Sequence, residues 1–263
     1  MWIVDVRHTS MIPLEFSGIT PDRLENLSVL EVSKLPVLFG SVRAELGEFA
    51  VISTDATDAI AVIRGDTGNV KRIGEGMTRG MLKVDGDVGM HAGENMVGGF
   101  LRIGGNGGDW LGAEMRGGEI AVGGNAGHNV GSAYRGSRLG MRGGSIVVSG
   151  NAGDELGLLM RRGSIVVEGT IGEFAGASMI AGTIVGSCGF GPRAGAGMKR
   201  GTLIACGPTE VAPGFRYSCD YEPAYLDLLR RQYHHTLPRP RTVRCYRGDI
   251  LTGGRGELLV LES

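Results

Sequence analysis

The chain has 263 residues, a formal net charge of -1 at neutral pH, and 48 glycines beside only 9 prolines. A chain of this length can bury a substantial core, and its balanced charge excludes a generally basic nucleic-acid-binding protein. The glycines follow no Gly-X-Y period and apolar residues are plentiful, so collagen and a disordered chain are also excluded.

Nothing in the sequence predicts export or membrane insertion. The N-terminal MWIVDVRHTS lacks a basic region followed by an apolar stretch, and no apolar run approaches the ~18 residues of a membrane span. The cysteines form no CxxC pair: they are Cys188, Cys206, Cys219 and Cys245. We therefore expect a cytoplasmic protein with reduced cysteines, no bound metal, and no membrane or nucleic-acid partner.

Residues 1–75 predict a small α+β domain. The segment TPDRLENL has Thr20 in the N-cap position and Pro21 at the first helical position, which is typical of a short helix. The segments EFAVIS and AIAVIRG have the composition of strands. We expect this domain to cap the open end of the repetitive structure that follows it.

A 19-residue repeat dominates residues 76–210. The phrase MRGGEIAVGGNAG at 115–127 returns as MRGGSIVVSGNAG at 141–153. Successive repeat methionines are 19, 19, 26, 19, 19 and 19 residues apart: Met77, Met96, Met115, Met141, Met160, Met179 and Met198. A glycine stands three residues after each methionine, and a leucine or isoleucine stands five residues after it. The single longer spacing indicates a seven-residue insertion within SAYRGSRLG at 132–140.

Each repeat predicts short strands joined by glycine turns, because its apolar residues alternate with a period of two in segments too short for a helix. One such unit cannot bury its own apolar face, whereas stacked units can. The sequence therefore predicts a mainly β fold: a right-handed parallel β-helix of about seven 19-residue rungs, with methionine, Leu/Ile and valine columns inside. Asn106, Asn125 and Asn151 share one column, which predicts an asparagine ladder with left-handed backbone. We also expect positive φ at Gly150 and Gly153.

Residues 211–263 predict a helix and strand extension. The segment EPAYLDLLRRQYHH at 222–235 begins near a proline and has helical spacing, with Tyr225, Leu228, Leu229 and Gln232 along one side. The segment RTVRCYRGDILTGGRGELLVL predicts strands around a TGGRG turn.

A search for a catalytic set finds none. His91 and His128 belong to repeats two apart, so their backbones should lie roughly 10 Å from each other, too far for a shared metal. His234 and His235 are adjacent at a helix end without carboxylates at ligand spacing, which is typical of surface histidines. No serine lies in a GxSxG elbow and no cysteine has a basic partner nearby in sequence. We therefore predict no catalytic residue and no metal ligand in this chain.

Charged residues follow the repeat. Cations one or two residues after the repeat methionines predict a basic stripe along one corner: Arg79, Arg116, Arg142, Arg161, Arg162, Lys199 and Arg200. Acidic residues thirteen or fourteen positions after the methionines predict an acidic stripe: Asp109, Asp154, Glu155 and Glu173. A solvated corner and a binding surface for an extended anion or a partner subunit both explain the basic stripe. Tyr134, Arg135 and Arg138 of the insertion are typical of an interface anchor, and a plain solvent loop explains them equally well.

The repeat and its flanks resemble a known family. The glycine-rich unit is similar to the β-helix shared by the C-terminal domain of glutamate synthase large subunits and by the C subunit of formylmethanofuran dehydrogenases. PLEFSGITPDRL, YRGD at 246–249 and GGRGEL at 253–258 resemble the C-subunit group, and this match covers nearly the whole chain. Within that group, the formyltransferase/hydrolase complex of methylotrophic bacteria uses a similar subunit. Arginine outnumbers lysine by 23 to 4, which favours the bacterial version over a thermophilic archaeal one.

The resemblance implies a non-catalytic structural subunit in a complex of four subunit types. Such a complex moves a formyl group from formyl-tetrahydromethanopterin to a methanofuran-type carrier and releases formate during one-carbon (formaldehyde) oxidation. In that family the formyltransferase and amidohydrolase-like activities belong to other subunits, which are the implied partners. The resemblance implies no cofactor bound by this chain; the methanofuran-type carrier and tetrahydromethanopterin act at the level of the complex.

Three alternatives stay open. The first is the C subunit of a molybdenum- or tungsten-dependent formylmethanofuran dehydrogenase, an oxidoreductase. The second is a glutamate synthase-type β-helix domain, and the third is a self-standing carbohydrate-active β-helix enzyme. The third needs paired carboxylates facing one groove, and the acidic stripe offers no such close pair. For the basic stripe, the resemblance implies two ligands, the glutamate tail of the carrier or an acidic surface of a neighbouring subunit.

Overall fold

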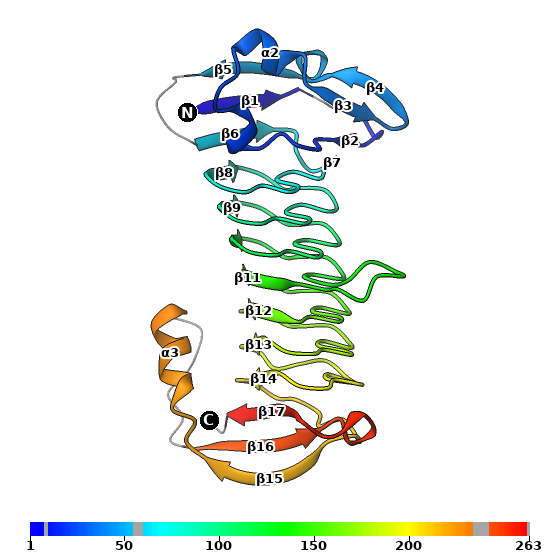
Figure 1. Ribbon diagram of the computed structural model, residues 1–263, viewed down its shortest axis with the longest axis vertical. Helices are drawn as coiled ribbons and strands as arrows, with labels where there is room; N and C mark the ends of the chain where they lie inside the picture. Colours follow the sequence, from blue (N-terminus) through cyan, green and yellow to red (C-terminus); the bar gives the residue numbers. More distant parts are fainter. Residues whose placement is uncertain (8–9, 55–59, 234–241, 262–263) are drawn as a thin grey trace.

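One sheet of thirteen strands runs along the whole length of an elongated molecule (Figure 1). The computed structural model describes residues 1–7, 10–54, 60–233 and 242–261. The middle strands come one from each repeat: β8 (Met81–Val84), β9 (Phe100–Ile103), β10 (Glu119–Val122), β11 (Arg142–Val148), β12 (Arg162–Val167), β13 (Thr183–Gly186) and β14 (Thr202–Ala205). The fold is therefore mainly β, as the sequence predicts.

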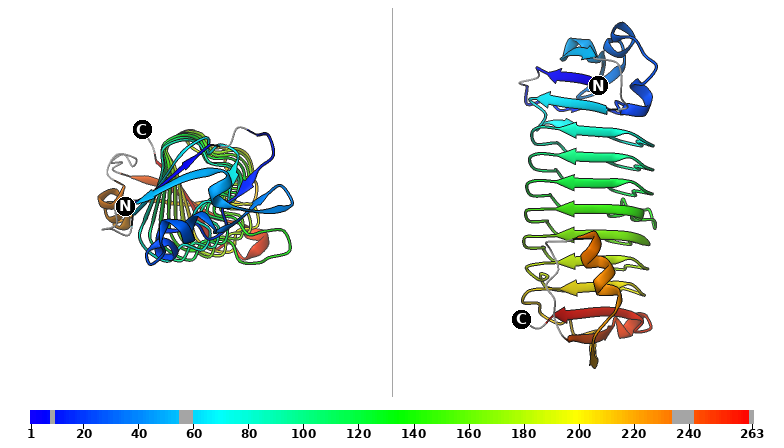
Figure 2. Two further views of the ribbon diagram at one scale, coloured as in Figure 1. Left: turned by 90° about the horizontal axis from the view of Figure 1, so that it is seen from above. Right: turned by 90° about the vertical axis from the view of Figure 1, so that its left-hand side faces the viewer.

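Equivalent residues of successive repeats face each other across these parallel strands. Leu101 pairs with Ile120, and Ile146 pairs with Ile165. Ile120 also pairs with Ile146 across the insertion, so the extra residues do not shift the register. Isolated parallel bridges join the same repeats at a second corner, through Val88, Gly107, Ala126, Ala152 and Ile171. Successive repeats are consequently superposed when the molecule is seen along its long axis (Figure 2).

Three apolar columns form the core between the corners. All seven repeat methionines are 0% exposed. The Leu/Ile column is at most 1% exposed and the valine column at most 2%. Burial of each such side chain stabilises the folded chain by about 1.5–3 kcal/mol relative to leaving it exposed. The predicted inward direction of these columns is confirmed.

The asparagine column forms the predicted ladder, but through side-chain hydrogen bonds and not through left-handed backbone. Oδ1 of Asn106 accepts the backbone N–H of Asn125 at 2.8 Å, and Asn125 accepts that of Asn151 at the same distance. Asn151 in turn accepts the N–H of Thr170. None of the three asparagines has a positive φ, so the expected left-handed backbone is wrong. Their side chains are needed instead as acceptors for the next repeat, where a lost partner would leave an N–H unsatisfied.

Gly150 and Gly153 also lack a positive φ, which corrects the prediction made for them. A Cβ atom on Gly150 would lie 2.4 Å from Oδ1 of Asn125, and one on Gly153 would lie 2.8 Å from Nδ1 of His128. The close approach of the preceding repeat therefore excludes a side chain at both positions. Left-handed backbone occurs instead in the glycines three and sixteen residues after the methionines, as at Gly144 with φ of 87° and Gly157 with φ of 69°.

The N-terminal residues extend the same sheet and add a second one. β1 (Trp2–Val6), β5 (Ala50–Thr54) and β6 (Ile60–Gly65) continue the large sheet beyond β8. β2 (Leu14–Glu15), β3 (Pro36–Phe39), β4 (Val42–Glu45) and β7 (Val70–Lys71) form a four-stranded sheet, with η1 (Leu46–Glu48) after β4. The expected helix begins at Pro21 and ends early, as α1 (Pro21–Leu24). A second short helix, α2 (Val29–Ser33), begins with a capping box between Ser28 and Glu31 that the sequence reasoning did not identify.

The C-terminal residues continue the sheet past the last repeat. β17 (Gly256–Leu261) pairs in parallel with β14, and β16 (Val243–Gly248) and β15 (Arg216–Tyr221) follow it in antiparallel order. η2 (Ile250–Thr252) lies directly before β17. No helix in the described part of the chain is both long and apolar enough to cross a bilayer.

Helix α3 (Tyr225–Gln232) lies against the outer face of the sheet beside the last repeats (Figures 1 and 2). Leu226 belongs to one buried cluster with Val166 and Val185 of that face. Of the side expected from spacing, Tyr225 and Leu229 are half-buried and pack against this cluster, whereas Leu228 is 65% exposed. The last turn is fixed by Tyr233, whose hydroxyl lies 2.5 Å from Oγ of Ser164.

Replacing Ile146 by Asp should prevent folding or lower stability by more than about 4 kcal/mol, because it places an unpaired charge in a closed core. Ala121→Asp is the matched control, since Ala121 is half-buried on the outward face of the neighbouring strand. Urea unfolding of the purified variants measures both. A wild-type midpoint for Ile146→Asp would contradict the inward direction of its column.

Candidate functional site

The structure separates the predicted basic stripe into three groups. Arg79 lies in the first repeat, where its hydrogen bond and ion pair with Glu25 raise the pKa of the guanidinium and compensate its positive charge. A central group comes from three successive repeats: Arg116, Arg142, Arg161 and Arg162. Ile180 and Ala181 then occupy the equivalent positions, and Lys199 and Arg200 resume the stripe one repeat later. The stripe is therefore interrupted rather than continuous.

The central group is held in place by the stacking of the repeats. The backbone N–H of Arg116 donates to the carbonyl of Met96 at 2.7 Å, and that of Arg142 donates to Met115 in the same way. Neighbouring cations are thus held at about the strand spacing, ~4.8 Å. Like charges at this spacing repel, so the group attracts a counter-charge.

The insertion leaves the stack without breaking it. The N–H of Met141 still donates to the carbonyl of Gly131 at 2.9 Å, the bond that Met160 makes to Gly157 in a repeat without insertion. Residues 134–140 therefore form the seven-residue excess, which is the green loop that projects from the stack in Figure 1. Arg135 and Arg138 are exposed on it. The guanidinium of Arg161 donates twice to the carbonyl of Arg138, at 3.3 Å, and so joins the loop to the central basic group.

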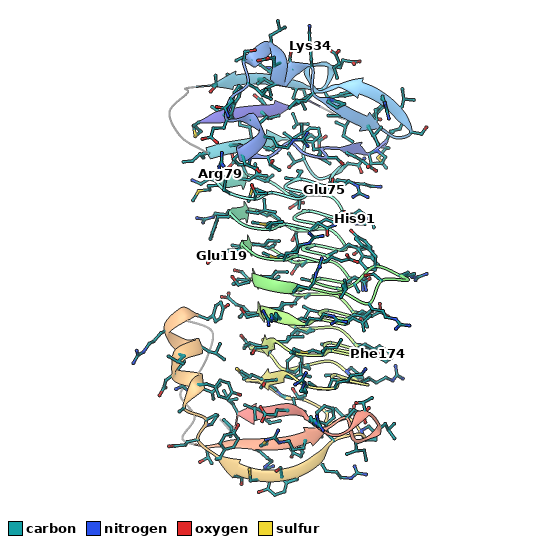
Figure 3. The ribbon with its side chains drawn as sticks, in the orientation of Figure 1. Lys34, Glu75, Arg79, His91, Glu119 and Phe174 are labelled. Atoms are coloured by element: carbon teal, nitrogen blue, oxygen red, sulfur yellow. The ribbon has the colours of Figure 1, made fainter. Side chains whose placement is uncertain are left out.

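Tyr134 holds the base of this loop down. Its ring stacks on Trp110, with centroids 4.8 Å apart and planes 24° apart. Its hydroxyl lies 2.8 Å from Nδ1 of His91, and its N–H donates to Glu114 at 3.3 Å. We call Tyr134, Trp110 and His91 the tyrosine clamp. Figure 3 places His91 on the opposite side of the stack from Arg79.

A group of ion pairs, of which only Glu94 is buried, lies beside the tyrosine clamp. Nη1 of Arg72 lies 2.5 Å from the buried carboxylate of Glu94, and Arg72 also pairs with Glu15 and Glu75. Burial raises the pKa of Glu94. Burial, assisted by Arg72, lowers the pKa of His91, and burial together with Glu94 raises the pKa of the Tyr134 hydroxyl. The clamp therefore favours a neutral His91 and a protonated Tyr134.

The acidic stripe serves the stack itself. Oδ1 of Asp109 accepts the N–H of His128, and Nδ1 of His128 accepts the N–H of Asp154 at 3.0 Å. Asp154 accepts the N–H of Glu173, whose carboxylate pairs with Arg193 at 2.7 Å. Oε2 of Glu155 accepts a hydrogen bond from the side chain of Asn129. These groups have internal partners, so the stripe is a ladder along one corner.

Other candidate groups are scattered. His234 and His235 lie outside the described residues. Cys188 and Cys219 are exposed, Cys206 is half-buried, Cys245 is buried, and all four are free thiols. Burial raises the pKa of Cys206 to about 12, which keeps it protonated. Among residues 1–7, 10–54, 60–233 and 242–261, no three His, Cys, Asp or Glu side chains are grouped so that they could hold a metal ion.

One charged residue of the site was missed in the sequence. Arg255 belongs to the TGGRG turn and lines one pocket together with Lys199 and Arg200. Its position does not follow the methionine register, so the repeat gave no signal for it. The turn motif that contains it was the available signal.

Comparison with known proteins gives a match over almost the whole chain. It is to a crystal structure of the formyltransferase/hydrolase complex from Methylorubrum extorquens in complex with methylofuran, at a TM-score of 0.92 and 35% sequence identity. The alignment covers 99% of this chain and 100% of that chain. No family model matches the sequence.

Curated relatives match over a shorter segment. The C subunit of the molybdenum-containing formylmethanofuran dehydrogenase of Methanothermobacter thermautotrophicus is 42% identical over 80 residues. That of the tungsten-containing enzyme of Methanothermobacter marburgensis is 40% identical over 84 residues. Each match covers 30% of this chain. It spans 20% and 31% of the length of those two relatives.

The tyrosine clamp should make stability depend on pH. The folded state lowers the pKa of His91 from its ordinary value of 6.5. As the pH decreases below that value, the unfolded chain binds more protons than the folded chain, so the free energy of unfolding decreases. His91→Asn, which tolerates the φ of 66° at this position, should flatten this dependence. His128→Asn is the control, because asparagine already serves as a ladder acceptor elsewhere in the chain. Urea midpoints between pH 7.5 and 5.5 measure the effect; equal slopes for wild type and His91→Asn would contradict it.

Proposed function

This chain belongs to the family of formylmethanofuran dehydrogenase C subunits, and we propose that it is the non-catalytic structural subunit of a formyltransferase/hydrolase complex. The observation that carries the proposal is the end-to-end structural match to a chain of such a complex, at 35% identity. Methylofuran is bound to that complex. Here the partners would be the formyltransferase and amidohydrolase-like subunits in a hetero-oligomer.

The reaction of the complex would be formyl transfer from formyl-tetrahydromethanopterin to a methanofuran-type carrier, followed by release of formate. The use made of this chain's own polar groups supports a structural role in it. His128 and Asp154 accept backbone N–H groups of the next repeat, and His91 bonds the loop. Groups committed to holding the stack are poorly placed to transfer protons to a substrate. A cytoplasmic location is part of the proposal, and the four free thiols support it.

The finer architecture belongs to the same proposal. We infer a right-handed parallel β-helix of about seven rungs over 76–210, capped by 1–75 and extended by 211–263. The 19-residue parallel register and the parallel bridges at a second corner support it. A stiff stack of this kind suits a component that keeps other subunits at fixed separations.

Two surfaces are proposed for contact with other components. The loop 134–140 displays Arg135 and Arg138, while Tyr134 contributes by holding the loop rather than by entering a partner. The central basic group either guides the anionic tail of the carrier or faces an acidic surface of a neighbouring subunit. Exposed pairs of this kind contribute about 0–1 kcal/mol each, which would attract a tail without trapping it.

A second candidate is the C subunit of a molybdenum- or tungsten-containing formylmethanofuran dehydrogenase. The names of the shorter matches favour it. Those matches cover less than a third of either chain, whereas the match to the formyltransferase/hydrolase complex is complete. We therefore place the dehydrogenase second.

Native mass spectrometry of the assembly purified through a tag on this chain tests the proposal. We expect three further subunit types and no molybdopterin-containing subunit. Deleting residues 134–140 restores the regular spacing between Ala133 and Met141, so it should preserve folding and weaken association. Co-purification of a molybdopterin or iron–sulfur subunit would establish the second candidate instead. Unchanged assembly of the deletion variant would exclude the loop from the interface.

A triple variant, Arg116→Gln, Arg142→Gln and Arg162→Gln, tests the central basic group. Arg161 is kept because it holds the loop. If the group guides the tail, the apparent KM for the long-tailed carrier should rise about two- to tenfold, most at low salt. The KM for a tail-less analogue is the control and should not change. Loss of assembly would indicate a subunit interface. If neither the KM for the long-tailed carrier nor assembly changed, the group would be only a solvated corner.

A further inference from the structure

Two cysteines face each other across the last two strands of the large sheet. In the antiparallel pairing of β15 and β16, Cys219 is the partner of Cys245. Directly opposite residues of antiparallel strands have Cα atoms about 4.5–5.5 Å apart, which lies within the ~4.4–6.8 Å that a disulfide spans. Both thiols are free in this structure. The backbone therefore already has the separation that a bond between the two sulfur atoms requires.

The two thiols also lie on the same face of the sheet. Side chains alternate between faces along a strand, so Cys219 shares its face with Tyr221, two residues further on. Tyr221 packs against the buried cluster that contains Cys245 and extends to α3. On the opposite face, Tyr217 meets Tyr246 edge-on, with ring centroids 6.0 Å apart. The irregularity in the pairing comes between Tyr217 and Cys219, so it does not alter the phase between Cys219 and Tyr221.

Only one neighbouring strand holds β15, and contacts on both sides of the cysteines fix its register. β15 is the outermost strand of the sheet at this end. Directly after Cys219, Asp220 pairs with Arg244 across the two strands at 3.9 Å. β16 is itself held on its other side by β17, where Cys245 is opposite Leu259. A covalent bond between the cysteines would therefore secure the strand that has the fewest supports.

The two cysteines differ in their access to solvent. Cys219 is exposed on the edge strand, whereas Cys245 is 1% exposed. A small oxidant therefore reaches Cys219 first. Burial raises the pKa of the Cys245 thiol, and nearby Arg247 opposes this shift. An accessible cysteine beside a second, shielded cysteine is the arrangement found in thiols that oxidise reversibly.

We propose that Cys219 and Cys245 form a reversible disulfide site that hydrogen peroxide oxidises. The thiolate of Cys219 attacks one oxygen of the peroxide and breaks the O–O bond, which yields a sulfenic acid and a hydroxide that is protonated to water. The thiolate of Cys245 then attacks the sulfenic sulfur and expels a second hydroxide, which also becomes water, as the S–S bond forms. The two thiols lose two electrons and two protons, and the peroxide gains them. A dithiol reductant reverses the reaction.

The bond would close a loop of the chain that carries α3. The helix lies between the two cysteines in sequence, and its Leu226 packs in the same cluster as Cys245. A crosslink that closes a loop restricts the unfolded chain and so stabilises the folded one. Oxidation would fasten the edge strand and both ends of the segment with α3, while the repeats keep their own hydrogen bonds. The inference goes beyond the structural role proposed above, which the reduced chain already has.

Peroxide titration of the full chain tests the proposal, in a variant that keeps only this pair of thiols. Cys188→Ser and Cys206→Ala remove the other two cysteines. We expect the intact mass to fall by two hydrogen atoms, a proteolytic peptide pair joined through Cys219 and Cys245, and recovery of both thiols with dithiothreitol. The oxidised chain should unfold about 4–8 °C above the reduced one. Peptide mapping of the oxidised wild type should give the same crosslink, so the result does not depend on the folding of the variant.

A register-shifted variant is the matched control. Cys219→Ser combined with Asp220→Cys moves the exposed thiol by one residue, to the opposite face of β15. It should form no crosslink to Cys245 at the peroxide concentration that oxidises the original pair. Equal crosslinking in the control would overturn the proposal, as would thiols that stay free, a bond between two chains, or oxidation of Cys219 to a sulfinic acid alone. The intact complex should give the same crosslink; its loss on assembly would also contradict the proposal, because a partner would then shield Cys219.

Discussion

Hydrogen bonding between equivalent positions of successive repeats is the constraint on which the structure depends. Each repeat donates backbone N–H groups to the one before it, and side chains such as Asn125 and Asp154 supply acceptors where backbone carbonyls do not. Repeats packed this closely leave no space for a Cβ at positions such as Gly150 and Gly153. The glycine content follows from this contact, and so does the 19-residue register that keeps the apolar columns in line.

The same constraint explains what becomes of the chemically capable side chains. Histidine, aspartate and asparagine at the outer corner are used as acceptors for the next repeat, and the buried Glu94 is paired with Arg72. What remains available is positive charge, on the central basic group and in the pocket beside the TGGRG turn. A chain organised in this way is suited to position other molecules by charge and shape.

Periodicity made part of this predictable from sequence. Stacking places every copy of a column in the same environment, so the inward Met, Leu/Ile and Val columns and the ladder followed from spacing alone. Backbone conformation at Gly150 did not, because a left-handed turn and a close contact both select glycine. Features outside the register were also missed: Tyr134 bonds to His91 of an earlier repeat, and Arg255 reaches the pocket through a turn far along the chain from Lys199.

Hydrogen–deuterium exchange tests the central claim, that the stack is a rigid support formed before its partners bind. We compare the isolated chain with the assembled complex. The amides of β9 to β13 should be slow to exchange in both states, since their bonds are internal to the stack. Assembly should slow the exchange of amides in the loop 134–140 and around the central basic group. Fast exchange across β9 to β13 in the isolated chain, slowed only on assembly, would contradict the claim, because the stack would then depend on its partners to fold.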